Sequence, residues 1–380
     1  MKLYEFEGSE LFRQEGIPVP NYAVVSSPQE ARDKARAVGL PVIIKAQVLT
    51  GGRWLAGGIQ TAESLDEVET VAQRILGSSI GGLPVHRVMV AEKVETAREF
   101  YLGVTVDEYN GTPVAILSAD GGVYINEVGR DHPESVVSRN IPITTGLSPS
   151  EAKQMAREAG LSDQELVEVA GALRALYSVF RKYDTLLAEI NPLVRTTRGT
   201  YLALDAKVEI DDSSLYRHPD LNLVIEERIT NPLELKGRQI GVTYVELDGD
   251  IAVIASGAGL GLASIDIIGE TMRPANFLET GGAITADLLY NVMDLILQKP
   301  GIRAVFINLY GGINPIHEGA RGVARYMQEH NVTIPIVAKA LGNRQEETWE
   351  IFREQGVRVV TDVSTEKAVA ELARVLEAGN

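Results

Sequence analysis

The chain of 380 residues contains no cysteine, which excludes disulfide bonds, thiolate metal ligands and cysteine nucleophiles together. It also lacks an excess of positive charge, since its net charge is −16 and a general nucleic-acid binder would need a basic face. No stretch reaches the roughly 18 apolar residues of a membrane-spanning helix, and the first residues lack the apolar core of a signal peptide. We therefore expect a cytoplasmic protein that holds its ligands in local pockets.

The length is sufficient for two or three domains, and the pattern of the chain changes near residue 240. Up to about residue 235, strands and helices follow each other without strict alternation, which is typical of an α+β domain. From about residue 251, continuous apolar strands alternate regularly with helices, which predicts a doubly wound parallel sheet of the α/β class. We place the boundary between a domain of residues 1–238 and a domain of residues 239–380.

The predicted elements follow from hydrophobic periodicity. In the first domain we expect helices over 9–14 and 28–38, helical structure from about 150 to 183, and strands at 42–45, 87–90, 100–106 and 113–117. In the second domain we expect strands at 251–255, 304–309, 334–338 and 357–360, and helices over 262–270, 286–298, 318–330, 345–355 and 365–377.

Two strand-like runs, 187–193 and 204–207, are joined by a segment in which Gly199 can complete a short hairpin loop. If Thr196 pairs with Thr200, Asn191 lies opposite Asp205 and Glu189 lies opposite Lys207. Since residues two apart on a strand share a face, all four side chains then converge on one surface.

A carboxylate facing a carboxamide provides hard oxygen ligands, and Mg2+ binds such groups together with water and phosphate oxygens. Asn191 and Asp205 are therefore candidate metal ligands. The alternative is a solvated polar hairpin face on which Glu189 pairs with Lys207, and the spacing alone leaves both interpretations open.

Lys45 ends an apolar strand and would extend its ammonium group beyond the strand tip, where it meets either a phosphate or only solvent. Glycines on both sides of Arg53, at 51–52 and 57–58, allow backbone N–H groups to approach an anion closely. The alternative for this loop is an ordinary hairpin turn. Glu92 and Glu99 lie just before the strand predicted at 100–106, and an isolated carboxylate at such a strand edge is often simply solvated.

Two glycine-rich turns of the second domain follow apolar strands, and doubly wound folds bind ligands at that edge of the sheet. One turn contains Ser256 and the other contains Gly312, Ile313 and Asn314. Asn314 followed by Pro315 predicts an N-cap, and a helix N-terminus suits a phosphate or a carboxylate. The alternative is helix capping alone. His317, one turn further on, is expected on the helix surface.

Together these motifs resemble the succinyl-CoA synthetase β-subunit family, and the resemblance is collinear along nearly the whole chain. The matching segments are Gly-Ile-Pro-Val-Pro (16–20), Ile-Ile-Lys-Ala-Gln (43–47), Gly-Gly-Arg (51–53), Ala-Gly-Gly (56–58), Glu-Phe-Tyr-Leu-Gly (99–103), Glu-Ile-Asn-Pro-Leu (189–193), Leu-Asp-Ala-Lys (204–207), Tyr-Arg-His-Pro-Asp-Leu (216–221), Leu-Asp-Gly-Asp (247–250), Gly-Ala-Gly-Leu (257–260), Pro-Ala-Asn-Phe-Leu (274–278) and Tyr-Gly-Gly-Ile (310–313).

The resemblance implies an ATP-grasp fold followed by a flavodoxin-like CoA-ligase domain, in a chain that works only with an α subunit. That partner would carry the phosphohistidine and most of the CoA site, in an αβ or α2β2 assembly. The implied ligands are Mg2+ and ATP or ADP, with GTP or GDP also open. The implied nucleotide-binding residues are Lys45, Gly52, Arg53, Trp54, Glu92 and Glu99, with Asn191 and Asp205 on the metal and Glu189 catalytic; Ser256, Gly312, Ile313 and Asn314 would bind the organic acid or present a helix end to the phosphohistidine.

The chain departs from its relatives at several of these positions. Trp54 and Leu55 stand where the phosphate loop usually has glycine and lysine, Ser256 replaces a usual asparagine, and Asn314 follows Gly-Ile as it does in malate–CoA ligase β chains. Three interpretations remain open at this point. They are a succinate–CoA ligase β subunit, a malate–CoA or citrate–CoA ligase β subunit, and a non-catalytic β-like partner chain.

Overall fold

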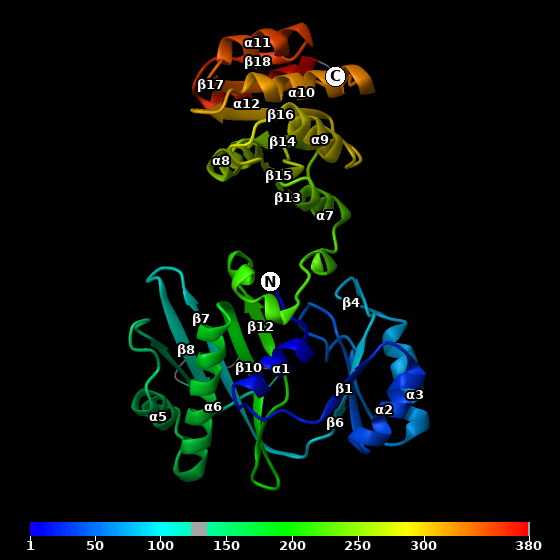
Figure 1. Cartoon of the computed structure of the whole chain (residues 1–380), viewed down its shortest axis with the longest axis vertical. Helices are drawn as coiled ribbons and strands as arrows, with labels where there is room; N and C mark the ends of the chain where they lie inside the picture. Colours follow the sequence, from blue (N-terminus) through cyan, green and yellow to red (C-terminus); the bar gives the residue numbers. More distant parts are fainter. Residues whose placement is uncertain (123–134, 379–380) are drawn as a thin grey trace. The chain divides into compact units, whose positions relative to one another are not determined.

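The structure, a computed structural model, describes residues 1–122 and 135–378 (Figure 1). The chain divides into two compact units, Met1–Val224 and Ile225–Asn380. The predicted boundary lies later in the chain, near the end of α7 (Pro232–Gln239), a helix that packs against β13 and α9 of the second unit. Within the two described ranges, no helix is both long and apolar enough to cross a membrane.

The first unit contains an antiparallel sheet of four strands in the order β1-β6-β2-β3, covered by α2 and α3. Alternate residues of β2, Val42 and Ile44, are buried in the core beneath these helices. Helix α2 has the predicted bounds because Ser27 caps it, accepting a hydrogen bond from the Glu30 N–H, and Pro28 occupies its first turn. The elements are β1 (Tyr22–Val25), α2 (Pro28–Val38), β2 (Val42–Ala46), β3 (Ile59–Ala62), α3 (Leu65–Leu76) and β6 (Val88–Glu92), with a short ribbon of β4 (Ser79–Ile80) and β5 (Leu83–Pro84).

A second antiparallel sheet of the first unit has the order β11-β10-β7-β8-β9, with β12 also paired to β10. Its core lies against α1, α5 and α6, and the strand residues Ala188 and Ile190 contribute to it. The alternation of β10 turns Glu189 toward the other face of the sheet. The elements are α1 (Glu5–Gln14), β7 (Thr96–Asp107), β8 (Thr112–Ser118), β9 (Val136–Asn140), α5 (Pro149–Glu158), α6 (Asp163–Lys182), β10 (Thr185–Thr196), β11 (Tyr201–Ala203), β12 (Lys207–Ile210) and the short helices η2 (Asp212–Arg217), η3 (Pro219–Leu221) and η4 (Glu226–Arg228), the last of which belongs to the second unit.

The predicted hairpin register is confirmed on both sides of a break in the ladder. The Thr196 N–H donates to the Thr200 carbonyl over 2.8 Å, and Glu189 pairs with Lys207. Between β11 and β12, residues 204–206 leave the ladder, and the Leu204 N–H bonds to the Pro192 carbonyl instead. Asp205 therefore projects from an irregular segment and not from a paired strand position.

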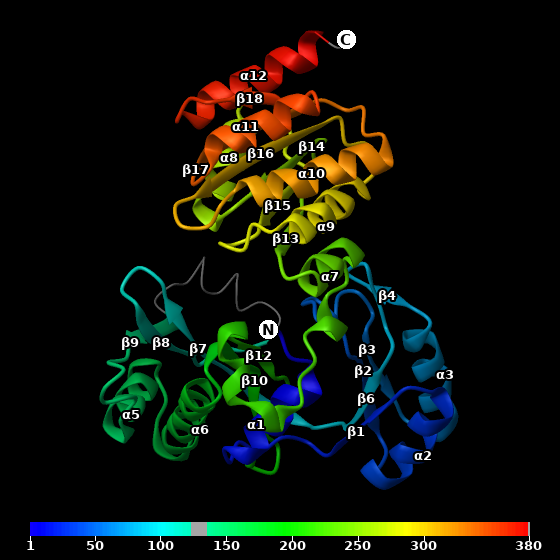
Figure 2. The same cartoon turned by 45° about the horizontal axis from the view of Figure 1, so that its top comes forward.

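The second unit contains a six-stranded sheet in the order β13-β15-β14-β16-β17-β18. Five strands of this sheet are parallel, and β13 runs antiparallel beside β15. The parallel part therefore has the flavodoxin-like order that the family resemblance implies. Figure 2 shows α9, α10 and α11 on one face and α8 and α12 on the other, each with its own core. The elements are β13 (Thr243–Glu246), β14 (Ile251–Ala255), α8 (Ala258–Gly269), β15 (Asn276–Glu279), α9 (Ala286–Leu297), β16 (Ala304–Gly311), α10 (His317–His330), β17 (Ile336–Gly342), α11 (Gln345–Glu354), β18 (Arg358–Val360) and α12 (Thr365–Ala378).

Three predicted helix starts are wrong. Helix α8 begins at Ala258, four residues before the predicted start at Leu262, because Gly257 already takes the N-cap position. Helix α1 begins at Glu5, four residues before the predicted start at Ser9, because the Glu7 carboxylate accepts the Tyr4 N–H over 2.8 Å and completes an earlier first turn. Asn314 does not cap α10, which begins at His317. The Asn314 side chain instead donates to the Gly282 carbonyl, in the loop after β15.

Candidate functional site

Four charged side chains meet within the first unit, on residues contributed by both of its sheets and by α1. Lys45 Nζ lies 2.7 Å from Glu5 Oε1, and Arg53 Nη1 lies 2.5 Å from Glu5 Oε2. The second guanidinium nitrogen of Arg53, Nη2, lies 2.9 Å from Asp205 Oδ1. The structure therefore brings three of the predicted site residues together around a carboxylate, Glu5, that the sequence analysis does not identify.

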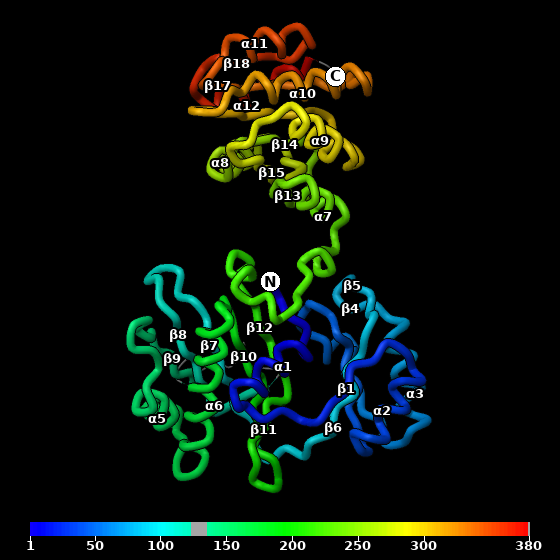
Figure 3. Tube along the Cα trace, in the orientation of Figure 1, coloured from blue at the N-terminus to red at the C-terminus, as the bar shows by residue number. Residues whose placement is uncertain are grey.

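The N-terminal segment places Glu5 in this cluster because it runs alongside β12 (Figure 3). The Leu3 N–H donates to the Val208 carbonyl over 2.9 Å, which fixes the chain just before α1 begins. Asp205 lies immediately before β12, so the same strand positions both carboxylates. This arrangement depends on pairing between residues about two hundred positions apart, and no local sequence signal reports it.

Lys45 and Arg53 are held by backbone carbonyls as well as by Glu5. Lys45 Nζ donates to the Leu204 carbonyl over 2.6 Å, and Arg53 Nη1 donates to the Ala46 carbonyl over 3.1 Å. Both cations are buried, with 9% of each residue exposed. A lysine at a solvated strand end, the alternative left open by the sequence, is therefore excluded.

The charged groups of the cluster are buried, and each offsets part of the cost of burying its partners. Burial raises the pKa of Glu5, but the ammonium of Lys45 and the guanidinium of Arg53 outweigh it and hold that pKa below its ordinary value. Burial and the charge of Glu5 raise the pKa of Asp205, against the opposing effect of the two cations. Two cations and two carboxylates balance in charge, so an added anion must compete with the carboxylates already present.

The other predicted polar residues of the hairpin face make separate contacts. Glu189 lies 3.3 Å from Lys207 Nζ, so the ion pair of the alternative interpretation is present. Asn191 Oδ1 accepts the Gly122 N–H over 2.8 Å. The hydrogen bonds of Asn191 and Asp205 thus go to different partners, and the two side chains share a region without bonding each other.

The donor set of Asn191 and Asp205 fits a magnesium ion that is held mainly by phosphate and water. One carboxylate and one carboxamide oxygen are the hard ligands that Mg2+ takes from a protein under those conditions. Among the described residues, no group of three or more histidine, cysteine, aspartate or glutamate side chains could hold a metal ion by itself. The pair therefore suits a metal that arrives with a nucleotide.

The remaining predicted nucleotide residues lie on β6, on β7 and in the loop after β2. Glu99 is exposed on β7, and a Cβ atom on Gly122 would lie 2.5 Å from its Oε2, so Glu99, Gly122 and Asn191 are neighbours. Glu92 ends β6 and is half-buried. Gly52 has φ of +71°, a conformation that favours glycine, and begins the phosphate-loop candidate.

Trp54 and Leu55 form the tip of that loop and are 59% and 78% exposed. The Ala56 N–H bonds to the Gly52 carbonyl over 3.1 Å, and the Gly58 N–H bonds to the Arg53 carbonyl over 2.8 Å. These bonds wind the loop so that Arg53 points into the unit while the two apolar side chains point to solvent.

In the second unit, Ser256 and residues 312–314 follow strands β14 and β16 at the carboxyl edge of the parallel sheet. Ser256 Oγ accepts the Tyr310 N–H over 2.8 Å and donates to the Tyr310 carbonyl over 3.2 Å. The Asn343 amide donates to the Ile313 carbonyl over 2.7 Å, while the Ile313 side chain is 90% exposed. The structure thus brings the predicted acid-binding residues to one edge, where side chains tie neighbouring loops together.

His317 is buried, contrary to the prediction of a surface position, with only 2% of the residue exposed. Its Nε2 lies 3.0 Å from Arg344 Nη1 at the start of α11, and its buried Nδ1 has no hydrogen-bond partner. The cause is the packing of α10 against α11, which covers the first turn of α10.

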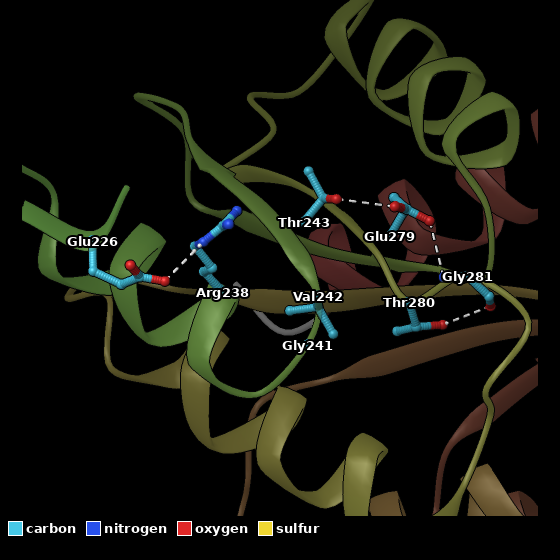
Figure 4. Close-up of a pocket in the computed structure, with 8 residues that line it drawn as sticks. All are labelled: Glu226, Arg238, Gly241, Val242, Thr243, Glu279, Thr280 and Gly281. Carbon is cyan, nitrogen blue, oxygen red and sulfur yellow. Dashed lines mark hydrogen bonds and ion pairs between the residues drawn. The ribbon is translucent and has the colours of Figure 1, made fainter. Parts of the chain in front are cut away.

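A cavity of about 530 Å³ lies beside α7, β13 and the loop after β15 (Figure 4). Arg238, the one cation among its lining residues, lies 3.2 Å from Glu226, and Glu279 accepts hydrogen bonds from Thr243 Oγ1 and the Gly281 N–H. None of the residues predicted to bind a nucleotide or an acid lines this cavity.

Comparisons with known proteins agree with this division of the chain. The ATP-grasp domain family matches residues 2–195, and the CoA-ligase family matches residues 254–373. The β subunit of a GDP-forming succinate–CoA ligase from Thermus thermophilus is 40% identical, covering 98% of this chain and 99% of its own length. The β subunit of an ADP-forming succinate–CoA ligase from Methanothermobacter thermautotrophicus is 39% identical, covering 99% and 100%.

Among solved structures, ATP citrate lyase from Methanothrix soehngenii, in complex with citrate and coenzyme A, superposes with a TM-score of 0.75 at 18% identity, covering 98% of this chain and 99% of that one. At that identity the likeness shows the fold alone. Fold and matches together define the β chain of an ATP-grasp acid–CoA ligase. The chain belongs to the succinate–CoA ligase β-subunit family.

Proposed function

We propose that the chain is the nucleotide-using subunit of a succinate–CoA ligase, which forms succinyl-CoA reversibly with an α-subunit partner. The observation that carries this proposal is the convergence of Lys45, Arg53 and Asp205 in the ATP-grasp half of a chain that matches its relatives over nearly their full length. Relatives of both the ADP-forming and GDP-forming kinds match, so the nucleotide base stays open between adenine and guanine.

In this proposal, Lys45 and Arg53 bind the phosphates, with the backbone of Gly52 and Trp54 beside them and Glu92 and Glu99 nearby. Asn191 and Asp205 would hold Mg2+, which when bound neutralises the charge that develops on the phosphates. Buried cations act more strongly on phosphate than solvated ones because little water screens them.

The γ-phosphoryl group of ATP would then pass to a histidine of the α subunit, breaking the bond to ADP and forming a phosphorus–nitrogen bond. Glu189 would orient that histidine by accepting a hydrogen bond. Succinate would next take the phosphoryl group as an acyl phosphate, and the CoA thiol would displace phosphate to give the thioester. Ser256 and residues 312–314 are the proposed contacts of the second unit for the acid and the phosphohistidine, and the partner would hold most of CoA.

Asp205→Ala tests the nucleotide half of the proposal. We expect loss of Mg-dependent phosphorylation of the partner, because the variant removes the only carboxylate assigned to the metal. Assembly with the partner should persist, since Asp205 is partly exposed and contributes one ion pair to the cluster. Phosphorylation is followed with γ-labelled ATP and assembly by size-exclusion chromatography. Unchanged phosphorylation would show that Asp205 holds no essential metal.

A second candidate keeps the mechanism and changes the acid to malate or citrate. It rests on two departures from the family pattern, Ser256 in place of a usual asparagine and Asn314 after Gly-Ile. In the structure the Ser256 hydroxyl donates to the Tyr310 carbonyl and the Asn314 amide donates to the Gly282 carbonyl. Thioester formation on succinate, malate, citrate and acetate, with the native partner present, separates the candidates. Preference for an acid other than succinate would make Ser256 and Asn314 specificity residues, and no turnover by an intact complex would favour a non-catalytic chain.

A further inference from the structure

We propose that Glu5 is an internal counter-anion of the nucleotide site, which occupies Lys45 and Arg53 in the free protein and competes with nucleotide phosphate for them. The inference rests on the proposed function, because it needs Lys45 and Arg53 to be the phosphate-binding cations. Glu5 itself would contact no reacting atom. Its role is to set how tightly the site holds a polyphosphate.

The geometry shows one carboxylate shared between two cations. Each oxygen of Glu5 takes one of them, Oε1 at 2.7 Å from Lys45 Nζ and Oε2 at 2.5 Å from Arg53 Nη1. Only 6% of Glu5 is exposed, so little water screens its charge from the two cations. The carboxylate therefore neutralises the two cations, as the anionic oxygens of a phosphate group would.

The remaining charges show why this matters for binding. Without Glu5, Asp205 would be the one carboxylate of the cluster left to the two buried cations, and its ion pair goes to Arg53. An uncompensated buried cation is strongly destabilising, so the free chain needs Glu5. A phosphate that enters the site meets cations that Glu5 already neutralises. The affinity of the site for phosphate is therefore reduced, because the phosphate must displace Glu5 or share the cations with it. A site of this kind is stable when empty and releases its product readily.

The deciding variant is Glu5→Gln in the full chain, because it keeps the shape of the side chain and removes its charge. Binding is measured by calorimetric titration with ADP and with inorganic tripolyphosphate, both in EDTA so that no metal contributes. We expect a lower melting temperature without ligand, about tenfold tighter binding of both probes, and a larger ligand-induced rise in melting temperature than in the wild type. Equal or weaker binding would overturn the proposal, since it would make Glu5 a purely structural bridge.

Glu165 provides a matched control in the same unit. Its carboxylate also bridges two cations, Arg98 at 2.6 Å and Arg195 at 3.2 Å, and none of these residues belongs to the proposed site. Glu165→Gln makes the same change in charge and is expected to leave both affinities unchanged. Should it tighten binding as much as Glu5→Gln does, the effect would be one of net charge, and the proposal would fail.

Two further variants complete the test. Glu5→Asp keeps the charge but shortens the reach, so one cation is released and binding should tighten about threefold; weaker binding would overturn the proposal even if Glu5→Gln does not fold. Lys45→Met tests the proposed nucleotide site independently of Glu5, because it should abolish binding of both probes. Wild-type binding by Lys45→Met would refute the proposed nucleotide site, whereas its loss, without tightening in the Glu5 variants, would refute only the role of Glu5.

Discussion

Leu55 stands where the resemblance to the family implies a lysine, at the tip of a loop whose Arg53 belongs to the buried charge cluster. Its side chain is 78% exposed and contributes no charge. We predict that Leu55→Lys strengthens Mg-nucleotide binding by up to about fivefold, the range expected of one exposed charge beside an anion. Calorimetric titration at low and high salt checks this, because the gain should shrink as salt screens the new charge.

Ile143→Lys is the control for that variant, since Ile143 is also an exposed apolar residue of the first unit, at 56% exposure. It adds the same charge in another loop and should leave the affinity unchanged. If Leu55→Lys does not strengthen binding, the loop tip does not approach the phosphates. Trp54 and Leu55 would then be better explained as a surface that faces another molecule.

The limits of sequence analysis are clearest at Glu5 and His317. Glu5 looks like one of many acidic residues, and its function depends on the pairing of the N-terminal segment with β12. His317 looks like a surface residue of an amphipathic helix until α11 covers it. By contrast, Lys45, Arg53 and Asp205 could be identified because they lie in short segments with a recognisable pattern.

At the scale of elements, Ser256 joins the ends of two parallel strands. Its hydroxyl is bonded to both the N–H and the carbonyl of Tyr310, at the end of β16. Ser256→Ala leaves that N–H without its acceptor, and we predict that it destabilises the second unit by about 1–3 kcal/mol. Chemical denaturation measures the loss, and faster hydrogen exchange at the Tyr310 amide would locate it.

Ser256→Thr keeps the hydroxyl and is the matched control. It should retain slow exchange at Tyr310 even if the added methyl group disturbs packing. Fast exchange in Ser256→Thr, or unchanged stability in Ser256→Ala, would show that the hydroxyl does not hold the two strands together. Ser256 would then be available to bind an acid, as the resemblance to the family implies.

The hydrogen bonds in the turn between β7 and β8 predict how the stability of the protein changes at acid pH. Hydrogen bonds from the Asn110 side chain and then from Asn140 lower the pKa of Asp107 from 3.8 to about 2. Because the pKa is lower in the folded protein, the carboxylate stabilises the hairpin above pH 3.8, and this contribution is lost as the pH falls toward 2. Asp107→Asn should therefore melt below the wild type at pH 6, and the difference should vanish near pH 2.

Melting temperatures of both proteins across that pH range check the prediction. A difference that persists at pH 2 would mean that the asparagine disturbs the turn by its shape and not by its charge.

The hairpin is also an example of what the sequence predicts well. Both strands were expected within a few residues, but the network around Asp107 depends on β9 being paired beside β8.

Several elements of the second unit are predicted well because their apolar residues recur with a single strong period. Strand β14 and helix α9 agree with their predicted bounds to within a residue. The sequence analysis does not reveal β13 or β15, because strands of four residues have too few buried positions to show a pattern. Asn314 was misassigned as a cap because a local rule cannot account for the Gly282 carbonyl, which lies thirty-two positions away in the sequence.

For the whole molecule, the fold and the family leave the acid open. ATP citrate lyase and this chain share a fold at 18% identity, and one fold can carry several acid–CoA ligase activities. In the proposed function, selectivity would arise from individual side chains, and those at the carboxyl edge of the second unit are the proposed contacts. That is why the comparison of acids, and not a further structural match, decides between the two candidate functions.

Each of the two units has its own hydrophobic cores, and the proposed nucleotide site lies wholly within the first. We therefore predict two calorimetric transitions for the full chain, of which only the first unit's moves upward with Mg-nucleotide. A ligand at one hundred times its Kd stabilises the unit that binds it by about 2.7 kcal/mol. Leu173→Ala and Leu289→Ala assign the transitions, since each removes a fully buried core side chain of one unit at about 2–5 kcal/mol. A single transition that both variants lower and nucleotide raises would show that the two units unfold as one and would contradict the prediction.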